Sequence, residues 1–340
     1  MNKGKGLAVA ALAVLLVTGG CSSDEGDDPL ATAETAAEKP EPECLASSDV
    51  PSGVDAERPA VAIKVENDPA ARPLSGLEDA DVVYEEVVEG GITRFMAIYH
   101  CSESKRVGSV RSARFDDPKI ALPFTRILAF SGSNTIVGRE LKRQGMRTLV
   151  EGMKGTAFFR VPPGNPSVHS VFSDTEKLRD FAPRKTTPPT PGIFPIGDVP
   201  DGARSAEIVK VNFEAGNTIE YRWKDDAWQR FEDGAKFMTR AGDQIAVPNL
   251  LVQEVRVDNS NKIVDVEGHP SPELELVGTG RAVLFSDGKA QVGKWKIEKE
   301  TDPPSFTANS GEAFKFADGP VWVELVPSKK GEVPGKFSFK

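Results

Sequence analysis

Residues 79–100 read DADVVYEEVVEGGITRFMAIYH, and residues 101–114 continue as CSESKRVGSVRSAR. Two runs of β-forming apolar residues flank Gly90-Gly91, a pair that favours a two-residue hairpin turn because both of its positions need a positive φ. Glutamates and arginines are interspersed among these runs at a density that core packing alone does not need. The stretch therefore predicts a central β-hairpin that carries charged side chains.

A two-residue turn also predicts the register of the hairpin, because it determines which residues of the two strands face each other. In that register Glu85, Glu89 and Arg94 lie on one face of the sheet, close enough for contacts between the strands. Tyr84 and Phe95 lie together on the other face, which is mostly apolar and suited to a core.

Strands and helices alternate around the hairpin. Strands are predicted at Ala60–Val65, Arg126–Phe130 and Arg147–Val150, and a helix is predicted at Thr135–Arg143. A capping box beginning at Ser173 predicts a further helix as far as Phe181. This alternation indicates an α+β or α/β domain with a mixed sheet over residues 58–182.

The composition changes after a proline-rich connector at residues 183–205. Short β-forming runs follow, separated by Asp-Gly pairs and without helical periodicity. They predict an all-β domain, a small sandwich or barrel, over residues 206–328, with a polar tail at 329–340.

The N-terminus has the features of a lipoprotein signal peptide at residues 1–20. Lys3 and Lys5 precede the apolar run Leu7–Val17, small residues follow, and Cys21 comes next. In such a signal peptide the cysteine is diacylated and becomes the mature N-terminus, and two acyl chains give a stable membrane anchor. We therefore expect an exported chain held at the outer face of the cell membrane through Cys21. An ordinary signal peptide with an incidental cysteine is the alternative.

Residues 21–57 are rich in Asp, Glu, Ala, Ser and Pro and predict a disordered tether. Cys44 and Cys101 remain after lipidation of Cys21, and an oxidising compartment favours a disulfide between them over two buried thiols. The formal net charge is −9. A strongly acidic chain is repelled by nucleic acid, so no nucleic-acid partner is expected.

The segment ARPLSGLEDADVVYEEVVEGGITRFMAIYH, followed by VGSVRSAR, resembles the YerB-like bacterial lipoproteins. The later segments VGTGRAVLFSDGKAQVGKW and VWVELVP resemble the second domain of the same family. The resemblance covers residues 58–327 and implies a Gram-positive-type surface lipoprotein with an N-terminal mixed domain and a C-terminal β domain. Both domains have unknown function in that family, so the resemblance assigns no catalytic or ligand-binding residue.

Two constellations offer candidate chemistry. Glu85 and Glu89, beside Arg94 and Arg111, suit a general acid/base pair or a clamp for a carboxylate or phosphate ligand. The alternative is a structural network of ion pairs. His169 is a candidate base, or else a hydrogen-bonding residue of a loop.

The second constellation combines a strand-to-helix loop with nearby arginines and suits an anionic group of a cell-wall polymer or peptide. The alternative is a turn that merely uses small residues. The candidate ligand-binding residues of both constellations are Arg94, Arg111, Ser112, Arg114, Ser131, Ser133 and Asn134.

Other site motifs are missing from the sequence. The histidines are too scattered for a zinc site, so no metal or cofactor is expected. Asp116-Asp117 could contact a divalent cation, but they are expected instead to face water. The four tryptophans either line a sugar-binding groove or pack in the core. The sequence thus favours a non-catalytic binding or scaffold module at the membrane–wall interface, with a cell-wall polymer or an envelope protein as partner. The competing hypothesis is an envelope hydrolase or transferase using Glu85 or Glu89 with Arg94 and Arg111.

Overall fold

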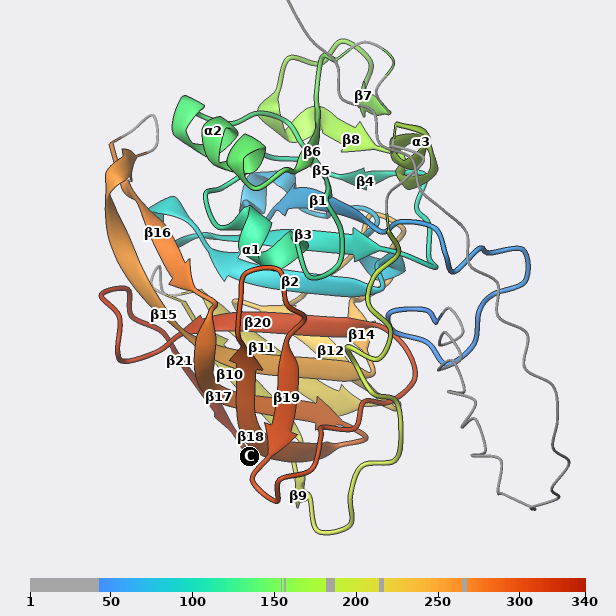
Figure 1. Cartoon of the computed structure of the whole chain (residues 1–340), viewed down its shortest axis with the longest axis vertical. Helices are drawn as coiled ribbons and strands as arrows, with labels where there is room; N and C mark the ends of the chain where they lie inside the picture. Colours follow the sequence, from blue (N-terminus) through green and yellow to red (C-terminus); the bar gives the residue numbers. More distant parts are fainter. Residues whose placement is uncertain (1–42, 154, 156, 182–186, 214–216, 265–267) are drawn as a thin grey trace, which may run out of the picture. The chain divides into compact units, whose positions relative to one another are not determined.

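A computed structural model describes residues 43–340 except 154, 156, 182–186, 214–216 and 265–267 (Figure 1). The predicted signal peptide, Cys21 and most of the predicted tether lie outside the described residues. The described residues belong to one compact unit.

The hairpin lies inside a mixed sheet whose strands are buried along their whole length at the centre. Such strands read as apolar runs because both of their faces are covered. β1 is antiparallel to β3 and parallel to β5, and β5 is parallel to β6. These strands are β1 (Val61–Glu66), β2 (Val82–Val87), β3 (Thr93–Tyr99), β5 (Ile127–Phe130) and β6 (Arg147–Val150).

The helices of the described residues are short. The predicted helix at 135–143 is confirmed as α2, and the Asn134 side chain caps it by accepting from the Val137 N–H. The last helix is capped by Asp174, so the predicted cap at Ser173 was wrong by one residue. The elements are η1 (Pro69–Ala71), η2 (Leu77–Asp79), η3 (Glu89–Gly91), α1 (Asp117–Ala121), α2 (Thr135–Arg143), η4 (Val168–Ser170) and α3 (Thr175–Asp180).

A small sheet lies beside β1 and consists of β4 (Val107–Gly108), β8 (Val171–Ser173) and β7 (Phe158–Arg160). Gly108 has φ +148°, and a Cβ atom there would lie 2.7 Å from the carbonyl oxygen of Val171. Only glycine fits this close approach of two backbones.

The C-terminal region is all-β, so the predicted fold class is confirmed. Within the described residues, β20 runs parallel to both β15 and β2, which makes one 12-stranded sheet that includes strands from both regions (Figure 1). The division of the chain into two domains at the connector stays a prediction. The strands are β9 (Arg204–Ser205), β15 (Asn249–Val264), β16 (Pro270–Glu275), β17 (Gly278–Ser286), β18 (Lys289–Ile297), β19 (Ser305–Ala308) and β20 (Val321–Pro327).

A six-stranded sheet packs on one face of the large sheet, with Trp228 against Phe285 and Phe95 against Phe237. Trp228, Trp295 and Trp322 are buried, so these tryptophans pack in the core. The sheet consists of β10 (Ile208–Asn212), β11 (Thr218–Lys224), β12 (Ala227–Glu232), β13 (Ala235–Lys236), β14 (Ala246–Val247) and β21 (Lys336–Phe339).

Both ends of the described chain are more ordered than the sequence predicts. The predicted polar tail contains β21, which pairs with β10 and packs Phe337 and Phe339 against the core. Residues 43–57, predicted as tether, include the buried Leu45. Cys44 is joined to Cys101 by a disulfide with a Cα–Cα distance of 5.6 Å, the pairing that the sequence predicts.

The predicted hairpin register was wrong by one residue. Glu85 lies opposite Phe95, and Glu86 lies opposite Arg94. Gly90 and Gly91 do have positive φ, but the connection is a 3-10 turn closed by a hydrogen bond from the Val88 N–H to the Ile92 carbonyl, 2.8 Å long. A shift of one residue exchanges the faces of a strand. Glu86 therefore takes the face predicted for Glu85.

Candidate anion-binding site

Four charged residues of neighbouring strands share one face of the mixed sheet. Arg94 on β3 lies opposite Glu86 on β2 and opposite Glu66 on β1, and Lys64 lies two residues before Glu66. All four side chains are buried. Burying so many charges is costly unless each has a partner of opposite charge.

Lys64 is paired with two buried carboxylates. Its ammonium group forms ion pairs with Glu86 and, at 2.7 Å, with Asp117. Burial raises the pKa of Glu86 to about 7, although Lys64 opposes that rise. Asp116 and Asp117 are both buried, so the expectation that they face water was wrong.

Arg94 has no carboxylate partner. Only 6% of it is exposed, and its Nη1 donates to the carbonyl oxygen of Ser112 at 3.1 Å. Among the described residues it forms no ion pair. Burial, together with the neighbouring charges of Arg114 and Arg111, lowers the pKa of Arg94 to about 9. Its guanidinium therefore has unused capacity to bind an anion.

Two further arginines, Arg111 and Arg114, lie close to Arg94. Both are half-buried, and each has a carboxylate partner. The Nε atom of Arg111 lies 3.4 Å from Glu66 Oε2. Arg114 donates from Nε to Glu89 Oε2 at 2.6 Å, and Ser271 donates to the same carboxylate. Against the effect of burial, these contacts lower the pKa of Glu89. Glu89 is thus a bound anion rather than a free base.

The structure brings the two parts of the second predicted constellation together, the strand-to-helix loop and the segment that contains Arg111. The Ser131 N–H donates to the Arg111 carbonyl at 3.0 Å, and the Ala113 N–H donates to the Gly132 carbonyl at 2.9 Å. Ser112 and Ser131 are half-buried, whereas Ser133 and Asn134 are exposed. The arginine cluster, defined as Arg94, Arg111 and Arg114, therefore lies beside the start of α2.

The predicted pairing of Glu85 with Glu89 does not occur. Glu85 lies on the opposite face of the sheet, where its carboxylate contacts Arg230 at 2.8 Å. Arg230 also contacts Glu232 at 2.9 Å and Glu324 at 3.1 Å, and all four side chains are buried. This network joins the two sheets, and burial raises the pKa of both Glu85 and Glu324. Glu85 is a structural residue in this arrangement.

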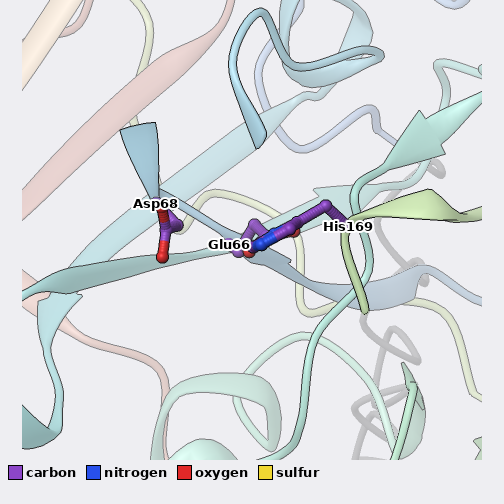
Figure 2. A group of neighbouring side chains, drawn as sticks. All are labelled: Glu66, Asp68 and His169. Carbon is purple, nitrogen blue, oxygen red and sulfur yellow. The ribbon is translucent and has the colours of Figure 1, made fainter. Parts of the chain in front are cut away.

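His169 contacts Glu66, the glutamate that Arg111 also contacts. Its Nδ1 is 2.9 Å from Glu66 Oε2, and Asp68 is the next acidic residue along the chain (Figure 2). From the sequence, residues 66–69 are predicted only as a turn, and neither Glu66 nor Asp68 is a predicted site residue. The available signal was the position of Glu66 and Asp68 at the end of a buried strand.

Residues 46–188 match the domain described as protein of unknown function (DUF3048), N-terminal domain, and residues 209–323 match its C-terminal domain. The chain belongs to the YerB-like family. It is 29% identical over 283 residues to the Bacillus subtilis protein described as "Putative lipoprotein YerB". The matched region covers 80% of this chain and 82% of that protein. The crystal structure of YerB protein from Bacillus subtilis matches with a TM-score of 0.67 and 25% identity, over 83% of this chain and 94% of that chain.

Proposed function

We propose that the chain is an exported lipoprotein, held at the outer face of the cell membrane by a diacylglyceryl group on Cys21. The basic residues, the apolar run and the cysteine at the N-terminus support this anchor, and so does the description of the Bacillus subtilis relative as a lipoprotein. Within the described residues, no helix has both the length and the apolar character to cross a membrane.

The folded part, in this proposal, is a non-catalytic module that binds anionic groups of a cell-wall polymer or an envelope protein. One observation supports it above the others: Arg94 is buried and positively charged, yet it has no carboxylate partner among the described residues. Arginine suits phosphate and carboxylate ligands because its planar fork donates two parallel hydrogen bonds. Arg111 and Arg114 add positive charge to the same place.

The geometry gives less support to a hydrolase or transferase that uses Glu85 or Glu89. A general acid or base must reach the substrate, and Glu85 is fully buried against Arg230. Glu89 is held by Arg114 and Ser271. Purified chain incubated with cell-wall fragments should release no product. Release that Glu89→Gln abolishes, with thermal stability unchanged, would favour the enzyme instead.

Titration calorimetry of the full chain in detergent tests the binding role, with inorganic phosphate and a purified anionic wall polymer as probes. We expect saturable binding that Arg94→Met abolishes. Arg126→Ala is the matched control, because Arg126 is an exposed arginine whose Nη1 donates to the Gln144 carbonyl. Absence of binding to both probes, or binding that survives Arg94→Met, would contradict the proposal.

A further inference from the structure

Three side chains that offer metal ligands converge at the C-terminal end of β1 (Figure 2). Glu66, Asp68 and His169 each present one oxygen or nitrogen atom, and these atoms all lie within 4.8 Å of one another. Ligands bound to one zinc ion at about 2.0–2.2 Å lie roughly 3–4 Å apart. Asp68 and His169 are half-buried, so small rotations of their side chains suffice to close the set around an ion.

Glu66 supplies a second observation that points to a ligand. Its carboxylate is 2% exposed, and its Oε1 atom is buried without a hydrogen-bond partner among the described residues. The other oxygen, Oε2, makes both of the carboxylate's contacts, to His169 at 2.9 Å and to Arg111 at 3.4 Å. An unsatisfied buried carboxylate oxygen is costly. A bound cation removes that cost.

We propose that Glu66, Asp68 and His169 bind a divalent transition-metal ion, with Zn²⁺ as the best fit. One imidazole nitrogen with two carboxylates is a ligand set for zinc or manganese, whereas Mg²⁺ and Ca²⁺ prefer oxygen ligands alone. Three protein ligands leave a further coordination position for water or an anion. None of the three ligands belongs to the arginine cluster, so the metal site does not depend on the proposed function.

The protein holds the two half-buried ligands in place through the backbone around them. Asp68 Oδ1 accepts from the Ala70 N–H at 2.8 Å, which orients the carboxylate at the start of η1. The His169 N–H donates to the Ser167 hydroxyl at 3.2 Å. The contact to Asp68 fixes the direction of its carboxylate before the metal arrives, and the contact at His169 fixes the backbone of its loop.

The half-buried Arg160 fixes the rest of the His169 loop. Nη1 of Arg160 donates to the carbonyls of Asn165 and Ser167, at 2.9 and 2.8 Å, and to the hydroxyl of Ser170 at 3.0 Å. The loop then continues into β8, whose Val171 carbonyl accepts from the Val110 N–H at 2.7 Å. The loop is thus tied to the segment that runs beside β1.

The test is a calorimetric titration of Zn²⁺ into the full chain in detergent, after treatment with a chelator. We expect one equivalent of Zn²⁺ to bind, and we expect His169→Gln, Asp68→Asn and Glu66→Gln each to weaken binding by about tenfold or more. His269→Gln is the matched control, since His269 is exposed and lies outside the three-residue cluster. X-ray absorption should report nitrogen and oxygen neighbours of the bound zinc.

No saturable binding of Zn²⁺ by the parent chain overturns the proposal, and so does unchanged affinity in the His169→Gln variant. Because Glu66 is buried, zinc binding by the Glu66→Gln variant is interpreted only if circular dichroism shows that the variant is folded. If it is not folded, the variants of the half-buried Asp68 and His169 provide the test. Titration with phosphate tests the proposed function independently of the zinc titration. Loss of phosphate binding with retained zinc binding contradicts only the proposed function, and the reverse contradicts only the metal site.

Discussion

Glu66 on β1 and Arg94 on β3 lie directly opposite each other, yet they do not form an ion pair. Glu66 contacts Arg111 and His169 instead, and Arg94 donates to the carbonyl of Ser112. The result is a buried arginine without a carboxylate partner next to a buried glutamate with one unused oxygen. The unpaired Arg94 supports the proposed anion site, and the unused Glu66 oxygen separately supports the proposed metal site.

Arg94→Met should leave the folded chain as stable as the parent, or more stable by up to about 2 kcal/mol, because it removes a buried charge without leaving a paired carboxylate alone. Urea denaturation measures the free energy of unfolding. A loss of more than about 2 kcal/mol would instead show that Arg94 is a structural residue.

Arg230→Met should have the opposite effect. It leaves Glu85, Glu232 and Glu324 buried between the two sheets without their shared cation, and breaking a buried pair in this way costs about 3–5 kcal/mol. Urea denaturation of both variants, Arg230→Met and Arg94→Met, compares the free energies of unfolding after loss of each buried arginine. Equal stability of the two variants would contradict the assignment of Arg230 to a structural network and of Arg94 to a binding site.

Glu86 should make stability fall as the pH rises. Its pKa is raised to about 7 from 4.5, mainly by burial, so the folded chain holds a proton that the unfolded chain releases between these values. The associated stability is complete below pH 4.5 and is lost as the pH rises through about 7, a change of up to about 3 kcal/mol. Urea denaturation at pH 5 and pH 7.5 should show Glu86→Gln gaining stability relative to the parent at the higher pH. A constant difference between the two proteins would refute this.

Gly108→Ala should destabilise the chain by several kcal/mol, roughly 2–4, because a Cβ there would lie 2.7 Å from the Val171 carbonyl. Gly164→Ala is the control: Gly164 also has a positive φ, but nothing lies within 4 Å of its added Cβ. Thermal denaturation compares the two variants. The prediction fails if Gly108→Ala costs no more than Gly164→Ala.

Reduction of the Cys44–Cys101 disulfide should lower the free energy of unfolding. The two cysteines are 57 residues apart, and closing a loop of that length contributes about 4 kcal/mol in the chain-entropy account. Urea denaturation with and without a thiol reductant measures the difference. The Cys44→Ser, Cys101→Ser double variant should show no response to the reductant.

The sequence by itself determined the central strands, helix α2 and the residues of the arginine cluster. Apolar runs, capping residues and turn glycines are local signals, so α2 and the central strands could be placed from them. The proximity of Arg111 and Arg114 to Arg94 also followed, because a short connection links them to the hairpin.

Only the tertiary structure determined which charged side chains contact each other. A one-residue change in the hairpin connection exchanged Glu85 for Glu86 on the face of Arg94, and local preferences do not distinguish turns that differ so little. Arg230 reaches Glu85 from β12, far along the chain, and His169 reaches Glu66 from η4. Pairings over such distances result from sheet packing and loop placement, because buried charges must find partners wherever the fold provides them.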